Sequence, residues 1–347
     1  MSAERGTAAL LLVGGPCGTV SGTAPSSHSS PPGAVCDRPR CDVQPSASSP
    51  VPQLRTEDLS SAQDGAGAAV SRQITALTVD FWNTLFGNAN GARRDRDRRA
   101  ALTAELEVVG FSVEQERLTS AARGAMTFFE HHWLANRRTP GPRELVGVMV
   151  DELGVQLPDA ALDRVATTFA EGVLEHPPNL LPGAREALES LHGHVRFALI
   201  SDTAFSPGRV LRELMEREGI ACFFSGFVFS DETGAAKPEP AAFHGALEQL
   251  GVGAAEAAHI GDIERTDIRG ARTVGMQAIL YRNEQHRHVL AEDTTEADTV
   301  VEHWSQVAEL LRAASSRASV RRSGAALDPV SLRGGGAEGA RCGQGLG

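Results

Sequence analysis

Five polar residues, far apart in the sequence, could together carry out phosphoryl transfer. Each stands at, or shortly after, the end of a short apolar segment: Asp80, Ser201, Lys237, Asp262 and Asp267. Carboxylates that lie close together can share a divalent cation, and their oxygens suit Mg²⁺. A hydroxyl and an ammonium beside them can hold an anion, while one carboxylate acts as the nucleophile. If the fold brings the five residues together, they predict transfer through an aspartyl-phosphate.

The apolar segments predict the strands of a parallel sheet. Residues 74–79 form a mostly apolar run that leads directly into Asp80. Further runs, separated by helical patterns, lie at 195–200, 227–229, 258–260 and 277–281. Strands that alternate with helices are typical of an α/β fold with a doubly wound parallel sheet. In such a sheet the carboxyl ends of the strands form the edge at which ligands bind.

A helical segment interrupts this alternation after the first strand. Four helical patterns follow one another there without a strand, at about 93–109, 113–135, 142–153 and 159–175. We interpret them as a helical domain at 92–178, inserted into an α/β core at 73–91 and 179–316.

Two features of the helical segment have simple structural interpretations. Trp133 lies at helical spacing with other apolar residues and is expected in the core of the helical domain itself. The Arg93–Arg99 run is interleaved with Asp95 and Asp97, and such a mixed charge run is expected on a solvated helix face rather than at an anion site.

Composition narrows the classes of protein. The net charge of −11 argues against nucleic-acid binding, and no apolar run is long enough to span a membrane. The five cysteines are scattered, which favours neither a disulfide framework nor a metal cluster. Residues 1–72 and 317–347 are rich in small and polar residues and are predicted to be disordered. The apolar run at 8–13 is a poor signal peptide, so we expect a cytoplasmic protein.

The motifs around the five residues resemble those of the haloacid dehalogenase-like (HAD) hydrolase superfamily. The segment 80–85 resembles the first motif, the strand that ends in Ser201 the second, Lys237-Pro238 the third, and 259–271, with its Gly-Asp-x4-Asp pattern, the fourth. The resemblance covers residues 73–315. It implies a Rossmann-like core and, at 92–178, an α-helical cap of the subfamily I type that closes over small substrates.

The resemblance also implies a Mg²⁺ site. Asp80 would be both the nucleophile and a metal ligand. The backbone carbonyl of Trp82 and the carboxylate of Asp262 would be further ligands, and Asp267 would brace the metal site.

A substrate site is implied beside the metal. Ser201 would donate a hydrogen bond to the phosphoryl group, and Lys237 would neutralise that group and keep Asp80 ionised. Asp202 is grouped with these two as a substrate-binding residue. Among 33 basic residues Lys237 is the only lysine, and its compact ammonium suits a place that the planar fork of arginine would not fit.

One position departs from the phosphatase pattern. Phosphatases of this superfamily carry a second aspartate, the general acid, where this chain has Trp82. The haloacid dehalogenases carry a tyrosine there, but they work without metal and lack the acidic pair that this chain keeps as Asp262 and Asp267. Phosphonate-cleaving relatives use a cap lysine, and residues 92–178 contain none.

We therefore expect a Mg²⁺-dependent hydrolase of a small phosphorylated substrate, with an unusual or absent general acid. A 2-haloacid dehalogenase and a catalytically weak binding or regulatory protein are the alternatives. The candidates to replace the missing general acid are Asp202, Asp231, and either His131 or His132. Each also has a simpler interpretation: Asp202 as a structural or solvated residue, Asp231 as a cap of the loop after the third strand, and the histidines as the end of an amphipathic helix.

Overall fold

A six-stranded parallel sheet forms the centre of the α/β core. The computed structural model describes residues 74–282, 292 and 294–313, and the segments predicted to be disordered lie outside these residues. Neighbouring strands are all parallel, in the order β3-β2-β1-β4-β5-β6. Their bounds are β1 (Ala76–Val79), β2 (Arg196–Ser201), β3 (Phe224–Phe229), β4 (Ala257–Gly261), β5 (Gln277–Tyr281) and β6 (Thr299–Val301).

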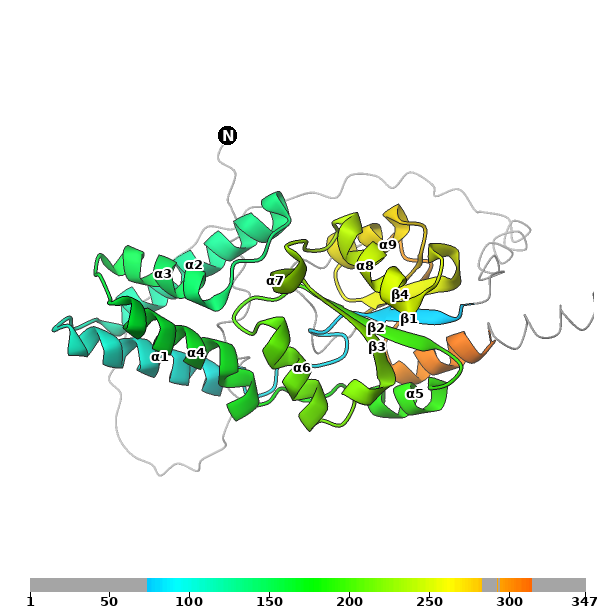
Figure 1. Cartoon of the computed structure of the whole chain (residues 1–347), viewed down its shortest axis with the longest axis horizontal. Helices are drawn as coiled ribbons and strands as arrows, with labels where there is room; N and C mark the ends of the chain where they lie inside the picture. The colour runs from blue at the N-terminus through cyan, green and yellow to red at the C-terminus, as the bar shows by residue number, and fades with distance from the viewer. Residues whose placement is uncertain (1–73, 283–291, 293, 314–347) are drawn as a thin grey trace, which may run out of the picture. The chain divides into compact units, whose positions relative to one another are not determined.

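Helices cover both faces of the sheet (Figure 1). On one face, α5 (Ala184–Leu191), α6 (Gly208–Arg217) and the helical residues 304–313 share an apolar core with the strands. On the other face, α8 (Pro240–Leu250) and α9 (Arg269–Thr273) form a second core with the strands. Every residue of β1 is buried, as the apolar run before Asp80 requires for a central strand. The predicted doubly wound α/β fold is therefore confirmed.

Two strands differ from the prediction. Strand β3 begins at Phe224 rather than at Phe227, because Ser225 and Gly226 interrupt the apolar run from which the strand was predicted. Gly226 lies where a Cβ would come within 3.0 Å of Gln249 Cβ, so the packing of α8 on the sheet requires glycine there. Strand β6 was not predicted, since its three residues are too short a run to stand out from a loop.

The four predicted helices between β1 and β2 are present, and we call them the helical unit. They are α1 (Gly91–Val108), α2 (Gln115–Asn136), α3 (Pro142–Leu153) and α4 (Asp159–Glu175). Their apolar side chains form a core of their own, which three loop residues from the carboxyl edge of the sheet join: Phe205, Ala236 and Ile263. The helical unit therefore packs against the edge at which the predicted site lies.

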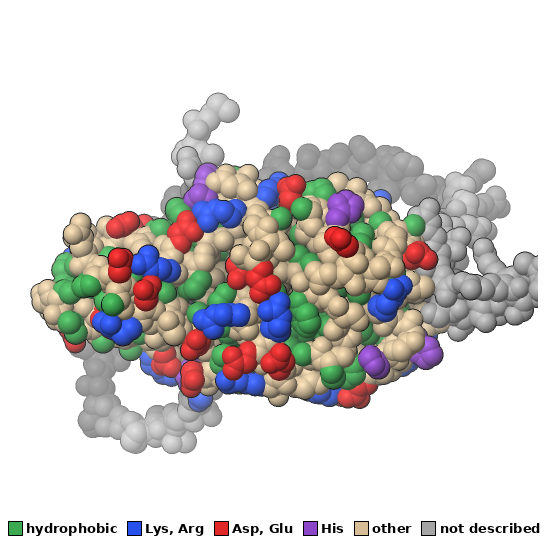
Figure 2. All heavy atoms as spheres, viewed as in Figure 1, with side chains coloured by type: hydrophobic (Ala, Val, Ile, Leu, Met, Phe, Trp, Pro, Cys, Tyr) green, Lys and Arg blue, Asp and Glu red, His purple; other side chains and the backbone are tan. Residues whose placement is uncertain are grey.

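The surface carries paired charges. Figure 2 shows acidic and basic side chains interspersed on one face of the molecule. Exposed arginines pair with neighbouring glutamates, as in Arg212–Glu232 at 3.1 Å and Arg217–Glu213 at 2.7 Å. None of the described helices is both long and apolar enough to cross a membrane.

Between the long elements lie short helical turns. These are η1 (Ala221–Phe223), α7 (Ser230–Thr233), η2 (Ala254–Glu256) and the π-helical turn η3 (Glu264–Ile268). Turn η3 stands where the sequence predicted the start of a helix at Asp267. It directs the Asp267 side chain back towards the end of β4, where Oδ2 accepts a hydrogen bond from the backbone N–H of Ile263 at 3.1 Å.

Candidate active site

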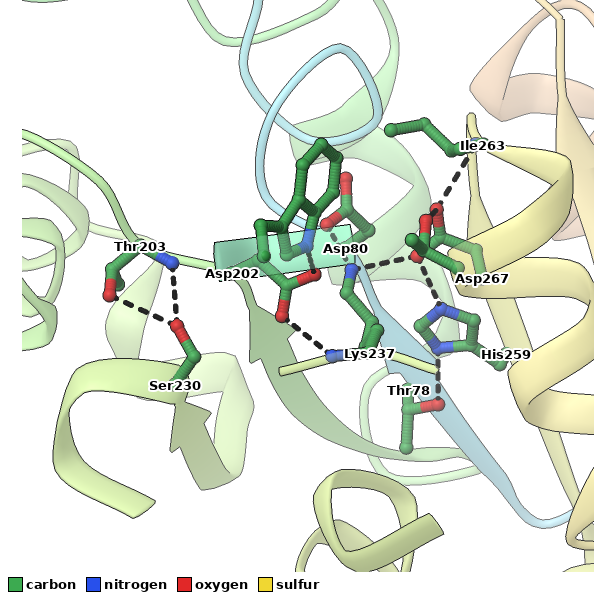
Figure 3. Close-up of polar contacts among 11 residues, drawn as sticks. Thr78, Asp80, Asp202, Thr203, Ser230, Lys237, His259, Ile263 and Asp267 are labelled. Carbon is green, nitrogen blue, oxygen red and sulfur yellow. Dashed lines mark hydrogen bonds and ion pairs between the residues drawn. The ribbon is translucent and has the colours of Figure 1, made fainter. Parts of the chain in front are cut away.

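The five predicted residues lie at the carboxyl ends of adjacent strands, or in the loops that follow them. Asp80 follows β1, the neighbour of both β2, which ends in Ser201, and β4, which is followed by Asp262. Lys237 enters from the segment after β3 and α7, with its ammonium directed between Asp80 and Asp267 (Figure 3). The shared edge of a parallel sheet therefore brings these side chains together, as the sequence predicts.

Lys237 makes two buried ion pairs at the centre of the site. Its Nζ lies 2.5 Å from Asp80 Oδ1 and 2.7 Å from Asp267 Oδ1, and the lysine is only 2% exposed. Burial alone would lower the pKa of Lys237, but the charges of Asp267, Asp80 and Asp202 raise it above its usual value. Lys237 is therefore a permanent cation that holds one oxygen of Asp80.

The pKa of Asp80 is subject to opposing effects. Burial raises its pKa to about 7, while the charge of Lys237 lowers it and that of Asp267 raises it. Such a carboxylate gains from any further cation or hydrogen-bond donor brought near it, because either would offset the loss of solvent.

Asp267 has both oxygens engaged by the protein. Oδ1 accepts from Lys237 and lies 3.1 Å from His259 Nε2, while Oδ2 accepts from the backbone N–H of Ile263 and from the hydroxyl of Thr266. Burial would raise the pKa of Asp267, but Lys237 and His259 hold it below its usual range. Asp267 therefore fixes the ammonium and the turn after β4, and its bracing of a metal site stays a prediction.

His259 extends this network and was not assigned a role from the sequence. The side chain is fully buried on β4, and burial lowers its pKa, so the imidazole is neutral. Because Asp267 is ionised, Nε2 carries the proton and donates to it, and Nδ1 accepts from the Thr78 hydroxyl at 2.8 Å. The sequence feature that could have indicated a role for His259 was its position inside an apolar strand, two residues before Gly261.

Two buried oxygens around Asp80 lack partners. Among the described residues, nothing donates a hydrogen bond to Ser201 Oγ or pairs with Asp262 Oδ2. Burial raises the pKa of Asp262 well above its usual value, and the charges of Asp80 and Asp267 raise it further. A buried, unpaired carboxylate oxygen beside a second carboxylate fits a divalent cation, and an unpaired hydroxyl beside an ammonium fits an oxyanion.

The carboxylates by themselves form an incomplete cation site. Within residues 74–282, 292 and 294–313, no group of three or more His, Cys, Asp and Glu side chains has the arrangement of a metal site. The two carboxylates available are Asp80 and Asp262, so a cation held there would need a backbone oxygen and water as further ligands. Mg²⁺ commonly binds in this way, with few carboxylates and several waters.

Asp202 links the site to the helical unit. Its Oδ1 accepts from the backbone N–H of Lys237 at 2.9 Å, and its Oδ2 accepts from the indole N–H of Trp133 at 2.8 Å. Trp133 is 5% exposed and belongs to the core of the helical unit, as predicted, but the prediction missed this contact across to the sheet. Asp202 is thus a structural connector and not a solvated residue, and burial raises its pKa to about 6.

The other substitutes for a general acid have structural roles. Asp231 accepts from the Thr203 hydroxyl at 2.9 Å and from the Gly208 backbone N–H, so it caps the start of α6. His131 is exposed, while His132 contacts the Asn136 side chain at 2.9 Å, within α2. None of these contacts involves Asp80.

Trp82 occupies the position of the missing acid. The half-buried indole packs edge-on against Phe81, with ring centroids 4.9 Å apart, and joins the apolar core under the sheet. An indole has an N–H donor only and cannot exchange a proton near neutral pH. The position that follows the nucleophile by two residues therefore offers shape and apolar surface, not acid–base chemistry.

The prediction of a solvated face for the arginine run is correct for Arg93, Arg96 and Asp97, which are exposed, but wrong for three other residues of the run. Arg94, Asp95 and Arg98 are all buried on α1, with 3%, 8% and 7% of their surface exposed. Together with Trp82 and Phe205 they line a pocket next to the site.

A sequence profile of the haloacid dehalogenase-like hydrolase family matches residues 74–275, more than half of the chain. The chain belongs to the haloacid dehalogenase-like hydrolase family. The crystal structure of a 2-haloacid dehalogenase from Pseudomonas syringae pv. tomato shares 26% identity with this HAD protein and superposes with a TM-score of 0.50, covering 70% of this chain and 99% of the other.

Curated relatives of this HAD protein include phosphatases. A phosphoglycolate phosphatase from Pseudomonas fluorescens is 30% identical over 203 residues, which cover 57% of this chain and 72% of that one. A phosphoserine phosphatase from Thermus thermophilus is 43% identical over 68 residues, covering 20% of this chain and 27% of that one. The chain spans between about a quarter and a half of the length of the first curated relatives that it matches.

Proposed function

We propose that this HAD hydrolase is a Mg²⁺-dependent phosphatase that acts on a small phosphorylated substrate through an aspartyl-phosphate on Asp80. The observation that carries the proposal is the arrangement around Asp80: one oxygen is held by Lys237, while Ser201 Oγ and Asp262 Oδ2 are buried and find no partner in the part of the chain that the structure describes. A phosphoryl group would satisfy the serine, and a cation would satisfy the aspartate.

In this mechanism the protein's own side chains position the phosphoryl group and neutralise its charge. The oxygen of Asp80 that Lys237 does not hold attacks phosphorus, the bond to the leaving alkoxide breaks, and the phosphoryl group transfers to Asp80. Ser201 and Lys237 bind the equatorial oxygens, where charge is greatest in the transition state. Water then attacks the aspartyl-phosphate and releases phosphate. Mg²⁺, held by Asp80, Asp262 and the Trp82 carbonyl, would supply charge neutralisation.

The helical unit would act as the cap of this enzyme, with boundaries near residues 92 and 178. The hydrogen bond from Trp133 to Asp202 supports this role, since it joins α2 to the loop after β2 at the site itself. Contacts of Phe205, Ala236 and Ile263 with the core of the helical unit support it as well. Closure of such a unit excludes water from the reacting groups.

The test is phosphate release from a panel of phosphorylated metabolites and one aryl phosphate, measured with Mg²⁺ and with EDTA. We expect release to require Mg²⁺ and to fall at least about 10³-fold in Asp80→Asn, because the nucleophile is lost. Asp97→Asn, an exposed carboxylate on α1, is the matched control and should retain full activity. Release that persists in EDTA, or in Asp80→Asn, would contradict the proposal.

A second function is favoured by Trp82 and by the resemblance to the P. syringae enzyme: hydrolysis of 2-haloacids. Halide leaves without a proton, so an indole at the position of the general acid would not slow that reaction. Halide release from 2-chloropropionate in EDTA, absent in Asp80→Asn, would establish this function. Asp262 Oδ2, which has no partner among the described residues, argues for the phosphatase, since a reaction without metal leaves that buried oxygen unsatisfied.

A further inference from the structure

A pocket beside the site contains a buried guanidinium with an unused donor. It opens partly to solvent and is lined by Trp82, Arg94, Asp95, Arg98, Ala204 and Phe205, among others. Trp82 lies two residues after Asp80, and Ala204 lies three residues after Ser201, so two segments of the phosphoryl site continue directly into the pocket walls.

The hydrogen bonding of Arg98 is incomplete. Nη2 donates to Phe169 O at 3.2 Å, and Nη1 lies 3.5 Å from Asp95 Oδ1, at the outer limit of a hydrogen bond. Nε is buried and has no partner among the described residues. Because arginine carries five N–H donors, most of its capacity is unused, and a buried charge in that condition is costly.

Arg94 shows how the same helix satisfies an arginine that has a structural role. Its guanidinium donates to Ala89 O at 2.7 Å, to His176 O at 2.8 Å and to Asn88 Oδ1 at 2.6 Å. Asp95 can balance only one of the two arginines, so the pocket retains an excess of positive charge. Arg98 is the member of the pair whose donors remain for a ligand.

The surroundings of Arg98 favour a flat anion. The guanidinium carbon lies 4.6 Å from the centroid of the Phe205 ring, which covers one face of the guanidinium. A ligand must therefore approach in the guanidinium plane, along the edge where Nε–H and a neighbouring N–H are parallel donors, and because Nε is fully buried the side chains around it must move aside for the ligand. That edge matches the two oxygens of a carboxylate.

We propose that Arg98 binds a carboxylate of the substrate, so that the enzyme acts on small phosphate esters that also carry a carboxylate group. The proposal rests on the proposed phosphatase function and narrows its substrate class. The phosphoryl group would lie at Asp80, Ser201 and Lys237, and the carboxylate in the adjoining pocket. Arg98 would thus determine specificity, while the reacting groups stay on the sheet.

The test compares esters that differ only in the carboxylate. The substrates are 2-phosphoglycolate and 3-phosphoglycerate, each beside its carboxamide, assayed with the full-length protein and Mg²⁺. We expect wild type to prefer at least one acid over its amide by about 10- to 100-fold in kcat/KM, the value of a charge-assisted hydrogen bond. Arg98→Met should reduce this ratio to near one, and Arg98→Lys should restore part of it. Arg96→Met, an exposed arginine on the same helix, should keep the wild-type ratio.

Two results would overturn the proposal: a wild type without preference for either acid, or an Arg98→Met protein that loses activity equally on acid and amide, as a purely structural arginine would. Failure of the proposed function is distinguishable from both. Binding of the same four compounds to Asp80→Asn, with and without Arg98→Met, is measured by calorimetry and needs no turnover. A preference for the acid that depends on Arg98 in binding supports the pocket even if no ester is hydrolysed, and its absence refutes the pocket.

Discussion

Replacement of Lys237 tests the centre of the site most directly, since charge and size can be changed separately. Lys237→Met keeps the approximate length of the side chain and removes the cation, which leaves Asp80 and Asp267 without their shared partner. Breaking a buried ion pair by removing one partner costs about 3–5 kcal/mol. Lys237→Arg keeps the charge but adds bulk at a position that is 2% exposed, and such overpacking costs about 1–3 kcal/mol.

The two substitutions should differ in their dependence on pH. Without the ammonium, the pKa of Asp267 rises above that of the unfolded chain, and the pKa of Asp80, already about 7 in wild type, rises further, so the variant loses more stability than wild type as pH rises. In wild type the pKa of Asp267 lies below its usual range, so Asp267 stays ionised and its contribution is the same at pH 7.5 and at pH 5.5. The deficit of Lys237→Met should therefore shrink at low pH, from about 3–5 kcal/mol at pH 7.5 to about 1–2 kcal/mol at pH 5.5, mainly through the proton that Asp267 takes up in the variant, at roughly 1.4 kcal/mol per proton and pH unit. The deficit of Lys237→Arg should be the same at both.

The assay is urea unfolding at 25 °C in EDTA at the two pH values. Arg209→Met is the control, because it breaks an exposed ion pair with Glu171 and should cost less than about 1 kcal/mol. A deficit below about 1 kcal/mol for Lys237→Met at pH 7.5, or one that did not shrink at pH 5.5, would refute the account of the buried ion pairs.

Three further predictions concern neighbouring residues. Gly261→Ala should destabilise the fold by about 1–3 kcal/mol in urea unfolding, since a Cβ would lie 2.3 Å from Asp267 Cγ. The fluorescence of Trp133 should titrate near pH 6, where a proton on Asp202 weakens its acceptance of the indole N–H, and Asp202→Asn should abolish that transition. Trp82→Asp should raise hydrolysis of alkyl phosphates relative to aryl phosphates by about 10²-fold, measured as the ratio of kcat values, because it restores a general acid.

The core of the site could be predicted from the sequence because a parallel sheet converts linear order into proximity. Apolar runs identified the strands, and a polar residue at the end of a strand can only lie at the carboxyl edge. Asp80, Ser201 and Lys237 needed no knowledge of side-chain packing. The network of His259 and Thr78 did need it, because a polar residue inside a strand gives no sign of which neighbour it faces.

The sequence predicted the four helices of the helical unit but not which face of α1 is buried. The mixed charges of the Arg93–Arg99 run predict a solvated helix face, because charge runs usually lie on one. The contrary signal was present: Arg94, Arg98, Leu102 and Leu106 recur every four residues, so they share one face of α1, and both leucines are fully buried. The prediction relied on the charged composition of the run, whereas the spacing of its residues decides which face of the helix is buried.

Asp202 shows why a raised pKa does not make a residue the general acid. With a pKa of about 6 it could hold a proton near neutral pH, as a substitute for the aspartate that Trp82 replaces. Yet both of its oxygens already accept N–H donors, one from the Lys237 backbone and one from Trp133. Those donors favour the carboxylate form and fix its direction, so Asp202 ties the helical unit to the site instead of delivering a proton to the leaving group.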